Sequence, residues 1–252
     1  MLDPNRTIGQ LVAERPSRAR VFERFGIDYC CGGQVPLARA CAAKGLSVAA
    51  VLREIEANDL QVATSETVDW VPETLGRLID FIVATHHAYL RRELPRLTVL
   101  IDKVAAAHGG RHPELNELRS VFASLREGLE AHLAEEEQVA FPLIKQLEAA
   151  RAISGSPPIG LADSLRDMER EHDEVGAALA RLRTLTGGYA PPADACNTFR
   201  AMLNGLAELE TDLHYHVHRE NNILFPGAKS AEAEMLAGAP MAGRISPRPL
   251  AG

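Results

Sequence analysis

One short motif occurs twice in this chain of 252 residues. Residues 132–142 read HLAEEEQVAFP and residues 216–226 read HVHRENNILFP, so each copy has a histidine, a glutamate four residues later, and then Phe-Pro. Side chains four apart on an α-helix are separated by about 40° around the axis and roughly 6 Å along it, so both can reach one metal site. The repeat therefore predicts two similar helical pairs facing each other around a metal, with ligands His132, Glu136, His216 and Glu220.

Each half of the repeat also offers a histidine on the preceding helix. His172 lies 44 residues before His216, and His87 lies 45 residues before His132, so the two halves match closely. Helical spacing of the apolar residues upstream points instead at His86. The residues alone therefore leave His86 and His87 as alternatives for the first half.

Four imidazoles and two carboxylates from four helices form a ligand set with a specific chemistry. A carboxylate that gives one oxygen to each of two cations offsets their repulsion, and two glutamates allow two such bridges. Imidazole suits zinc, copper, iron and nickel, and bridging carboxylates favour iron or manganese pairs, so this mixture is best matched by a di-iron centre. A structural zinc site, or histidines with no metal, is the competing interpretation.

The spacing of prolines and glycines predicts an all-α fold. Four long helices are expected over residues 72–107, 112–150, 161–186 and 191–226, and their short connections favour an antiparallel four-helix bundle. Shorter helices are expected in the amino-terminal part. We therefore predict a small helical domain over 1–62, a linker over 63–71, the bundle over 72–228 and a disordered tail over 229–252.

Charge and hydropathy restrict the partners and the location. Residues 1–66 hold eight basic and eight acidic residues, so the remaining chain carries the whole net charge of −7. An acidic bundle argues against nucleic acid as the main partner. No apolar run approaches the roughly 20 residues that span a bilayer, and the first ten residues lack a signal-peptide layout. We expect no membrane partner and a cytoplasmic location.

The four cysteines include an adjacent pair, Cys30 and Cys31, in a glycine-rich loop. Neighbouring cysteines rarely form a relaxed disulfide, and we expect reduced thiols in the cytoplasm. We expect the loop to leave both sulfurs accessible, so that they can accept iron or nitric oxide or relay electrons. The alternative is a pair of half-buried structural thiols.

The quoted segments resemble a known family. The two His/Glu motifs, together with Glu171-His172-Asp173-Glu174, resemble the hemerythrin-like domain of the repair of iron centres family. Residues 7–33, which end in Cys-Cys-Gly-Gly, resemble its separate cysteine-bearing domain. The resemblance covers about residues 5–228. It implies two non-haem iron ions with carboxylate bridges and an oxo or hydroxo bridge, held by His87, His132, Glu136, His172, His216 and Glu220.

The resemblance also implies an activity. Its members are associated with recovery of iron-sulfur clusters after nitrosative or oxidative stress, by iron donation or by reduction of nitric oxide to nitrous oxide. Damaged iron-sulfur proteins, an unidentified electron donor, and nitric oxide or dioxygen are then the expected partners. A reversible dioxygen or nitric oxide binder is the alternative, and a flexible linker would allow two chains to pair as a homodimer.

Overall fold

The computed structural model describes residues 2–63, 74–152 and 160–237. Every regular element in these ranges is a helix, apart from an isolated bridge between Thr7 and Pro36. The described chain forms two compact units: residues 2–63, 74–78, 150–152 and 217–237 make up the first, and residues 79–149 and 160–216 the second. The predicted all-α fold is confirmed.

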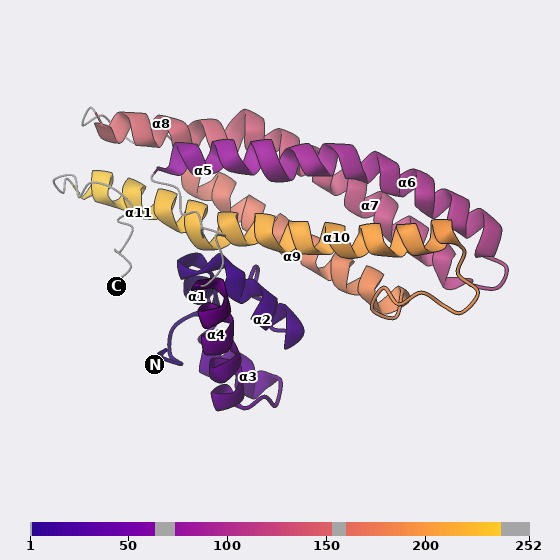
Figure 1. The fold of residues 1–252 in the computed structure, drawn as a ribbon. Coiled ribbons are helices and arrows are strands. Elements are labelled where there is room, and N and C mark those ends of the chain that lie inside the picture. The colour runs from indigo at the N-terminus through magenta and orange to yellow at the C-terminus, as the bar shows by residue number, and fades with distance from the viewer. Residues whose placement is uncertain (1, 64–73, 153–159, 238–252) are drawn as a thin grey trace. The chain divides into compact units, whose positions relative to one another are not determined.

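The amino-terminal part of the first unit consists of short helices, drawn in indigo and purple in Figure 1. They are α1 Ile8–Glu14, the 3₁₀ turn η1 Pro16–Arg18, α2 Ala19–Arg24, α3 Leu37–Ala43 and α4 Val48–Ala63. Thr7 begins α1 with a capping box, because its side chain accepts a hydrogen bond from the Gln10 amide and the Gln10 side chain accepts one from the Thr7 amide. The core contains Ile8, Leu11, Val12, Phe22, Leu37, Val51 and Ile55.

A buried arginine joins the helices of this part. Arg18 is only 4% exposed, and its guanidinium donates to both oxygens of Asp59 on α4, to Glu14 on α1 and to the Leu11 carbonyl. A buried cation is tolerated only when its donors are satisfied. Arg18 therefore fixes α4 against α1.

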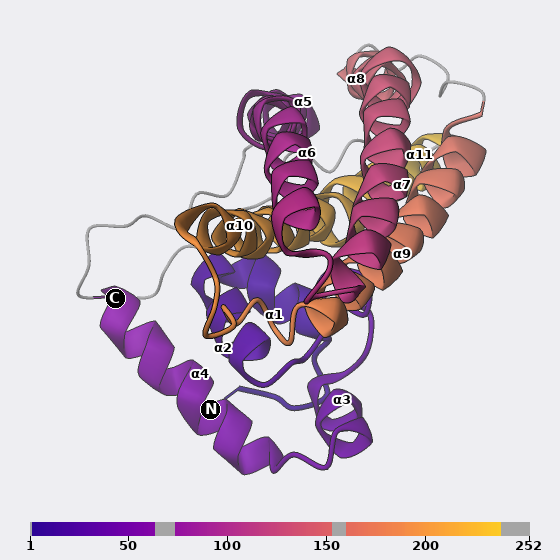
Figure 2. The same cartoon turned by 90° about the vertical axis from the view of Figure 1, so that its right-hand side faces the viewer.

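Four long helical segments follow, and three of them have the same construction. The first is α5 Leu75–Ile82, η2 Val83–His87 and α6 Ala88–His108; the second is α7 Glu114–Glu135, η3 Glu136–Ala140 and α8 Phe141–Ala152; the third is α9 Leu161–Leu185; the fourth is α10 Asn197–Arg219, η4 Glu220–Leu224 and α11 Phe225–Leu236. The turns η2, η3 and η4 are π-helical. Within the second unit, Figures 1 and 2 show α6, α7, α9 and α10 lying side by side, as expected of an antiparallel bundle.

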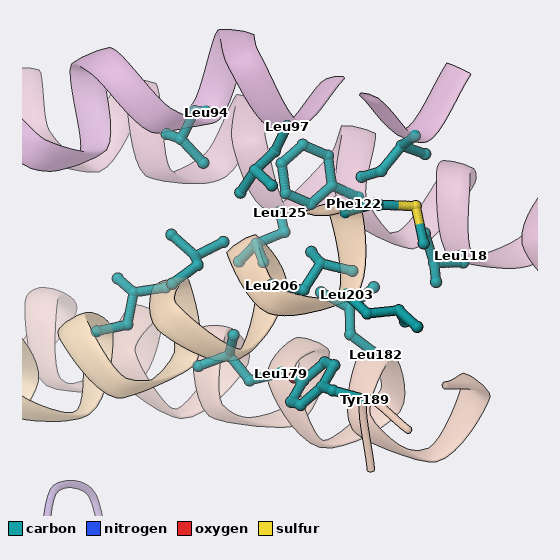
Figure 3. Close-up of a cluster of buried hydrophobic side chains, with 14 of the residues drawn as sticks. Leu94, Leu97, Leu118, Phe122, Leu125, Leu179, Leu182, Tyr189, Leu203 and Leu206 are labelled. Atoms are coloured by element: carbon teal, nitrogen blue, oxygen red, sulfur yellow. The ribbon is translucent and has the colours of Figure 1, made fainter. Parts of the chain in front are cut away.

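The bundle packs around leucines that recur at helical spacing. Figure 3 shows Leu97, Phe122, Leu182 and Leu203, which come from four different helices and point toward one another. Each of them is at most 2% exposed. Within the ranges that the structure covers, no helix has the length and apolar character needed to cross a membrane.

The fourth segment differs from its sequence-based prediction. We expected a helix ending near Phe225-Pro226 and disorder from residue 229, but α11 continues to Leu236. Pro226 lies in the first turn of α11, where a missing backbone N–H costs little, so the proline follows the π-turn without ending the helix. Residues 238–252, and nearly all of the predicted linker over 63–71, lie outside the described residues.

The bundle core gives a direct test of packing. Phe122→Ala should lower the free energy of unfolding by about 3–5 kcal/mol, because a fully buried ring leaves a cavity between the helices. Val99→Ala on α6 is a suitable control, since Val99 is 52% exposed and its truncation should change the free energy by less than about 0.5 kcal/mol. Denaturant unfolding measures both. Equal losses would contradict the packing described here.

Candidate metal centre

Each π-helical turn contains a predicted ligand. The turns Val83–His87, Glu136–Ala140 and Glu220–Leu224 end or begin at such a residue. A π-turn accommodates one extra residue in the helix and so shifts the phase of every later side chain, and such turns are frequent at functional sites. Regular spacing from the upstream apolar residues points at His86, and one inserted residue brings His87 to that face instead.

One pair of imidazoles joins the first and fourth helices. The Nε2 atoms of His87 and His216 lie 3.2 Å apart, and both residues are buried. On its other side the His87 ring contacts the Glu137 carboxylate, with Nδ1 2.6 Å from Oε1. Phe141, from the Phe-Pro of the first motif, stacks on the His87 ring at 5.6 Å. The recurring phenylalanine thus has a role in the first motif, because it holds a site histidine in place.

A second pair of imidazoles joins the second and third helices in the same way. The Nε2 atoms of His132 and His172 lie 3.0 Å apart, and His132 Nδ1 lies 2.7 Å from Glu171 Oε2. A carboxylate at Nδ1 fixes the tautomer with the proton on Nδ1, so the lone pair of Nε2 points toward the facing ring. His87 and His132, one ring of each pair, therefore have the orientation of metal-binding histidines.

Glu136 lies between the two pairs of imidazoles. Its Oε2 is 3.4 Å from His87 Nε2 and its Oε1 is 3.3 Å from His132 Nε2, and the residue is fully buried. The nitrogens and oxygens of His87, Glu136 and His216 lie within 4.8 Å of one another, and so do those of His132, Glu136 and His172. One carboxylate thus presents one oxygen to each imidazole pair.

This donor set fits two cations. Two nitrogens that are each about 2.1 Å from one ion, at roughly 90–100° to each other, lie about 3.0–3.2 Å apart, which is the separation found in both pairs. A buried carboxylate is costly without compensating charge or hydrogen bonds. Two cations, one on each side of Glu136, would supply that charge.

Glu220, the other predicted bridging residue, is described within the first unit. It is fully buried and begins the π-turn η4, four residues after His216 along a continuous helix. Of the six predicted ligands, the structure brings together five within the second unit, namely His87, His132, Glu136, His172 and His216.

Sequence reasoning missed the acidic residues that orient the imidazoles. Glu137 and Glu171 follow and precede predicted ligands directly, and this adjacency was the available signal. Burial alone would raise the pKa of Glu137, but hydrogen bonds from Arg91 and His87 outweigh it and hold the pKa below its usual value. The carboxylate therefore stays ionised as a partner for the His87 ring.

His86 has a different position from the one that simple helical spacing suggests. Its ring stacks on His216 with centroids 5.4 Å apart and planes 6° apart, and its Nδ1 lies 2.8 Å from Asp212 Oδ1. His86, held by Asp212, therefore packs against the face of the His216 ring.

The cysteine loop is closed by Asp28. Its carboxylate accepts the backbone N–H groups of Cys30, Cys31 and Gly32, each at 3.0 Å. The Cys30 thiol donates a hydrogen bond to the Cys31 sulfur, and the two sulfurs lie 3.8 Å apart. Contrary to expectation, only Cys31 is partly exposed, whereas Cys30 is 6% exposed. The hydrogen bond from Cys30 to Cys31 and the burial of Cys30 raise the pKa of the Cys30 thiol well above its usual value.

Asn222, in the π-turn that begins at Glu220, holds this loop. Its side-chain amide donates to the carbonyl oxygens of Cys30, at 2.9 Å, and Tyr29, at 3.3 Å. A Cβ atom at Gly33 would lie 2.1 Å from Asn222 Oδ1, and one at Gly9 would lie 2.2 Å away. Only glycine allows the backbone to approach this closely. The cysteine loop is therefore fitted to the turn that carries Glu220.

Measurements of bound metal distinguish the predicted roles of His86 and His87. His87→Ala should reduce the metal content to one ion per chain or fewer, because it removes a ligand. His86→Ala should keep the full metal content but bind it about 10–100-fold more weakly, as expected when a residue that supports a ligand is lost. Elemental analysis and chelator competition measure these quantities. Metal loss in His86→Ala with full retention in His87→Ala would reverse the assignment.

The fit between the cysteine loop and η4 predicts a coupled stability effect. Gly33→Ala should cost about 1–3 kcal/mol of unfolding free energy through overlap with Asn222. Most of that cost should disappear in an Asn222→Ala background. Gly128→Ala is the control, since a Cβ there meets only open space and alanine should stabilise α7 by about 0.5–1 kcal/mol. Equal costs of Gly33→Ala in both backgrounds would show that Asn222 is not what excludes the methyl group.

Comparison with known proteins agrees with this architecture. Residues 4–59 match the ScdA_N domain, a domain of unknown function, and residues 78–228 match the hemerythrin HHE cation binding domain. The iron-sulfur cluster repair protein YtfE of Enterobacter sp. (strain 638) is 38% identical over 89% of this chain and 97% of its own length. YtfE of Escherichia coli O157:H7 is 37% identical over 89% and 97%, and that of Yersinia pseudotuberculosis serotype IB 36% over 90% and 98%. The chain belongs to the YtfE family of iron-sulfur cluster repair proteins.

Proposed function

We propose that the protein is a di-iron protein that restores iron-sulfur clusters damaged by nitrosative or oxidative stress. The observation that carries the proposal is the position of Glu136, with one oxygen toward His87 and the other toward His132. A single cation needs no such arrangement, whereas two neighbouring cations need a shared anion. The repair activity in this proposal is taken from the relatives, which are named iron-sulfur cluster repair proteins.

In this proposal His87 and His216 would hold one iron, His132 and His172 would hold the other, and Glu136 would be shared between them. Glu220 supplies a second bridge, because it repeats Glu136 in sequence, is fully buried and follows His216 by one helical turn. Two bridging carboxylates with four imidazoles favour iron over zinc, whose structural sites take four ligands around a single ion.

The residues around the ligands keep the centre in a fixed geometry. Glu137 and Glu171 orient the rings of His87 and His132, and Asp212 does so for His216 through His86. The ligands themselves are nearly inaccessible to water, which limits unwanted release. When bound, a ferrous pair would supply two electrons for the reduction of small ligands.

Two routes to repair follow from such a centre. In the first, iron is cargo that is passed to a damaged cluster. In the second, two molecules of nitric oxide, two protons and two electrons give nitrous oxide and water, which removes the damaging agent. The second route needs an external electron donor to restore the ferrous state.

We also propose that Cys30 and Cys31 take part in this repair, as iron acceptors or electron relays. The partly exposed Cys31 is the thiol that meets a partner, whereas the buried Cys30 stays protonated until Cys31 has reacted. Asn222 links their loop to the turn of Glu220, so loss of iron from that turn can change how the thiols are held. A plain dioxygen or nitric oxide carrier, the alternative function, has no use for such a link.

A cluster-repair assay tests the proposal. A [4Fe–4S] dehydratase inactivated with nitric oxide is incubated with the iron-loaded protein and a reductant, and recovery of its activity is followed. Glu136→Ala should lower the recovery rate at least about tenfold, since removing a ligand exceeds the usual effect of removing its support. Glu130→Ala is the matched control, because Glu130 is an exposed residue on α7, which leads directly into the turn of Glu136.

The assay also distinguishes the routes. Recovery without nitrous oxide would identify iron donation, and nitrous oxide formed without a client protein would identify reduction. Stable, reversible ligand binding with no recovery of the dehydratase would contradict the proposal and favour the carrier.

A further inference from the structure

A cysteine and a histidine meet at the far end of the bundle, away from the candidate metal centre. His108 is the last residue of α6, roughly 30 Å along the helix from His87, and Cys196 immediately precedes α10. His108 Nε2 lies 3.3 Å from Cys196 Sγ. His108 is only 6% exposed, whereas Cys196 is an exposed free thiol. A buried imidazole therefore points at a sulfur that solvent can reach.

The other nitrogen of His108 determines where its proton lies. Arg111 Nη2 lies 3.4 Å from His108 Nδ1. A guanidinium can only donate hydrogen bonds, so Nδ1 is the acceptor and the neutral ring carries its proton on Nε2. The Nε2–H group then donates to the Cys196 sulfur. Phe199 packs on the His108 ring with centroids 5.2 Å apart and holds it in this orientation.

The position of Cys196 at the start of α10 is the second feature that bears on its sulfur. The Cys196 carbonyl accepts the first backbone hydrogen bond of α10 from the Arg200 amide, so the cysteine occupies the N-terminal cap of a helix of 23 residues. A helix N-terminus and a hydrogen-bond donor each favour negative charge on the atom that they face. The nearby carboxylate of Asp194 is itself paired with Arg111, at 3.4 Å, and with His112 Nε2, at 3.0 Å. Its repulsion of an anionic sulfur is thereby reduced.

We propose that Cys196, activated by His108, is a site of reversible modification by low-molecular-weight disulfides such as glutathione disulfide. The Cys196 thiolate attacks one sulfur of the disulfide and forms a new S–S bond as the original S–S bond breaks. The other half leaves as a thiolate and takes up the proton that Cys196 released, so no electrons are gained or lost overall. The exposed guanidinium of Arg111 offers a cation for a carboxylate of the incoming disulfide.

The modification site is separate from the iron chemistry proposed above. It uses none of the predicted metal ligands and does not depend on the Cys30–Cys31 loop. Its test can therefore succeed or fail independently of the repair function.

The test is the rate at which the full-length protein forms a mixed disulfide with glutathione disulfide, resolved for each cysteine by peptide mass spectrometry. We expect Cys196 to react faster than the partly exposed Cys31. His108→Phe keeps an aromatic ring against Phe199 but removes the N–H donor, and should slow Cys196 about tenfold. Cys31 should be unaffected, and the iron content should not change.

A second variant, at the surface, tests the proposal even if His108→Phe does not fold. Arg111→Met removes the group that sets the tautomer without disturbing the core, and it should also slow Cys196. Arg119→Met, an exposed arginine on α7, is its control and should leave the rate unchanged. Unchanged rates at Cys196 in both His108→Phe and Arg111→Met, or slower reaction of Cys196 than of Cys31 in the unmodified sequence, would overturn the proposal.

Discussion

A buried carboxylate between two pairs of imidazoles is the interaction on which this protein depends. Glu136 has no access to water, and a charge in such a place is unfavourable unless cations or donors surround it. His87 and His132 provide nitrogens on either side. Other features of the bundle keep those nitrogens in place: acidic partners on the outer faces of the rings, a phenylalanine stacked on His87, and π-turns that rotate ligands inward.

Much of this could be predicted from the sequence, because the repeat of histidine, glutamate and Phe-Pro reflects a local helical geometry. The π-turns could not, since a helix of one extra residue per turn has no simple compositional signal. That is why spacing favoured His86 over His87. Phe225-Pro226 was expected to end a helix that continues to Leu236, because a proline in the first turn of α11 does not stop it. The burial of Cys30 was also missed, and its loop is held by Asn222, 192 residues away in the sequence.

Within the first unit, the cysteine loop is held by the turn that carries Glu220. Asn222 lies two residues after Glu220 and donates to the backbone of the cysteine loop, while Gly9 and Gly33 leave room for its side chain. A change in the conformation of η4 would therefore alter the position of the cysteine loop. The thiols and the predicted ligand Glu220 are therefore joined through one side chain, that of Asn222.

The most direct test of the central claim is the amount and electronic state of iron in the protein purified without oxygen or added metal. Two irons per chain with magnetic coupling in Mössbauer spectra are expected if Glu136 and Glu220 bridge them. Glu136→Ala, which removes one of the bridges, should bind fewer than two irons per chain. A single ion per chain, or two uncoupled ions in the unmodified sequence, would contradict the bridged centre.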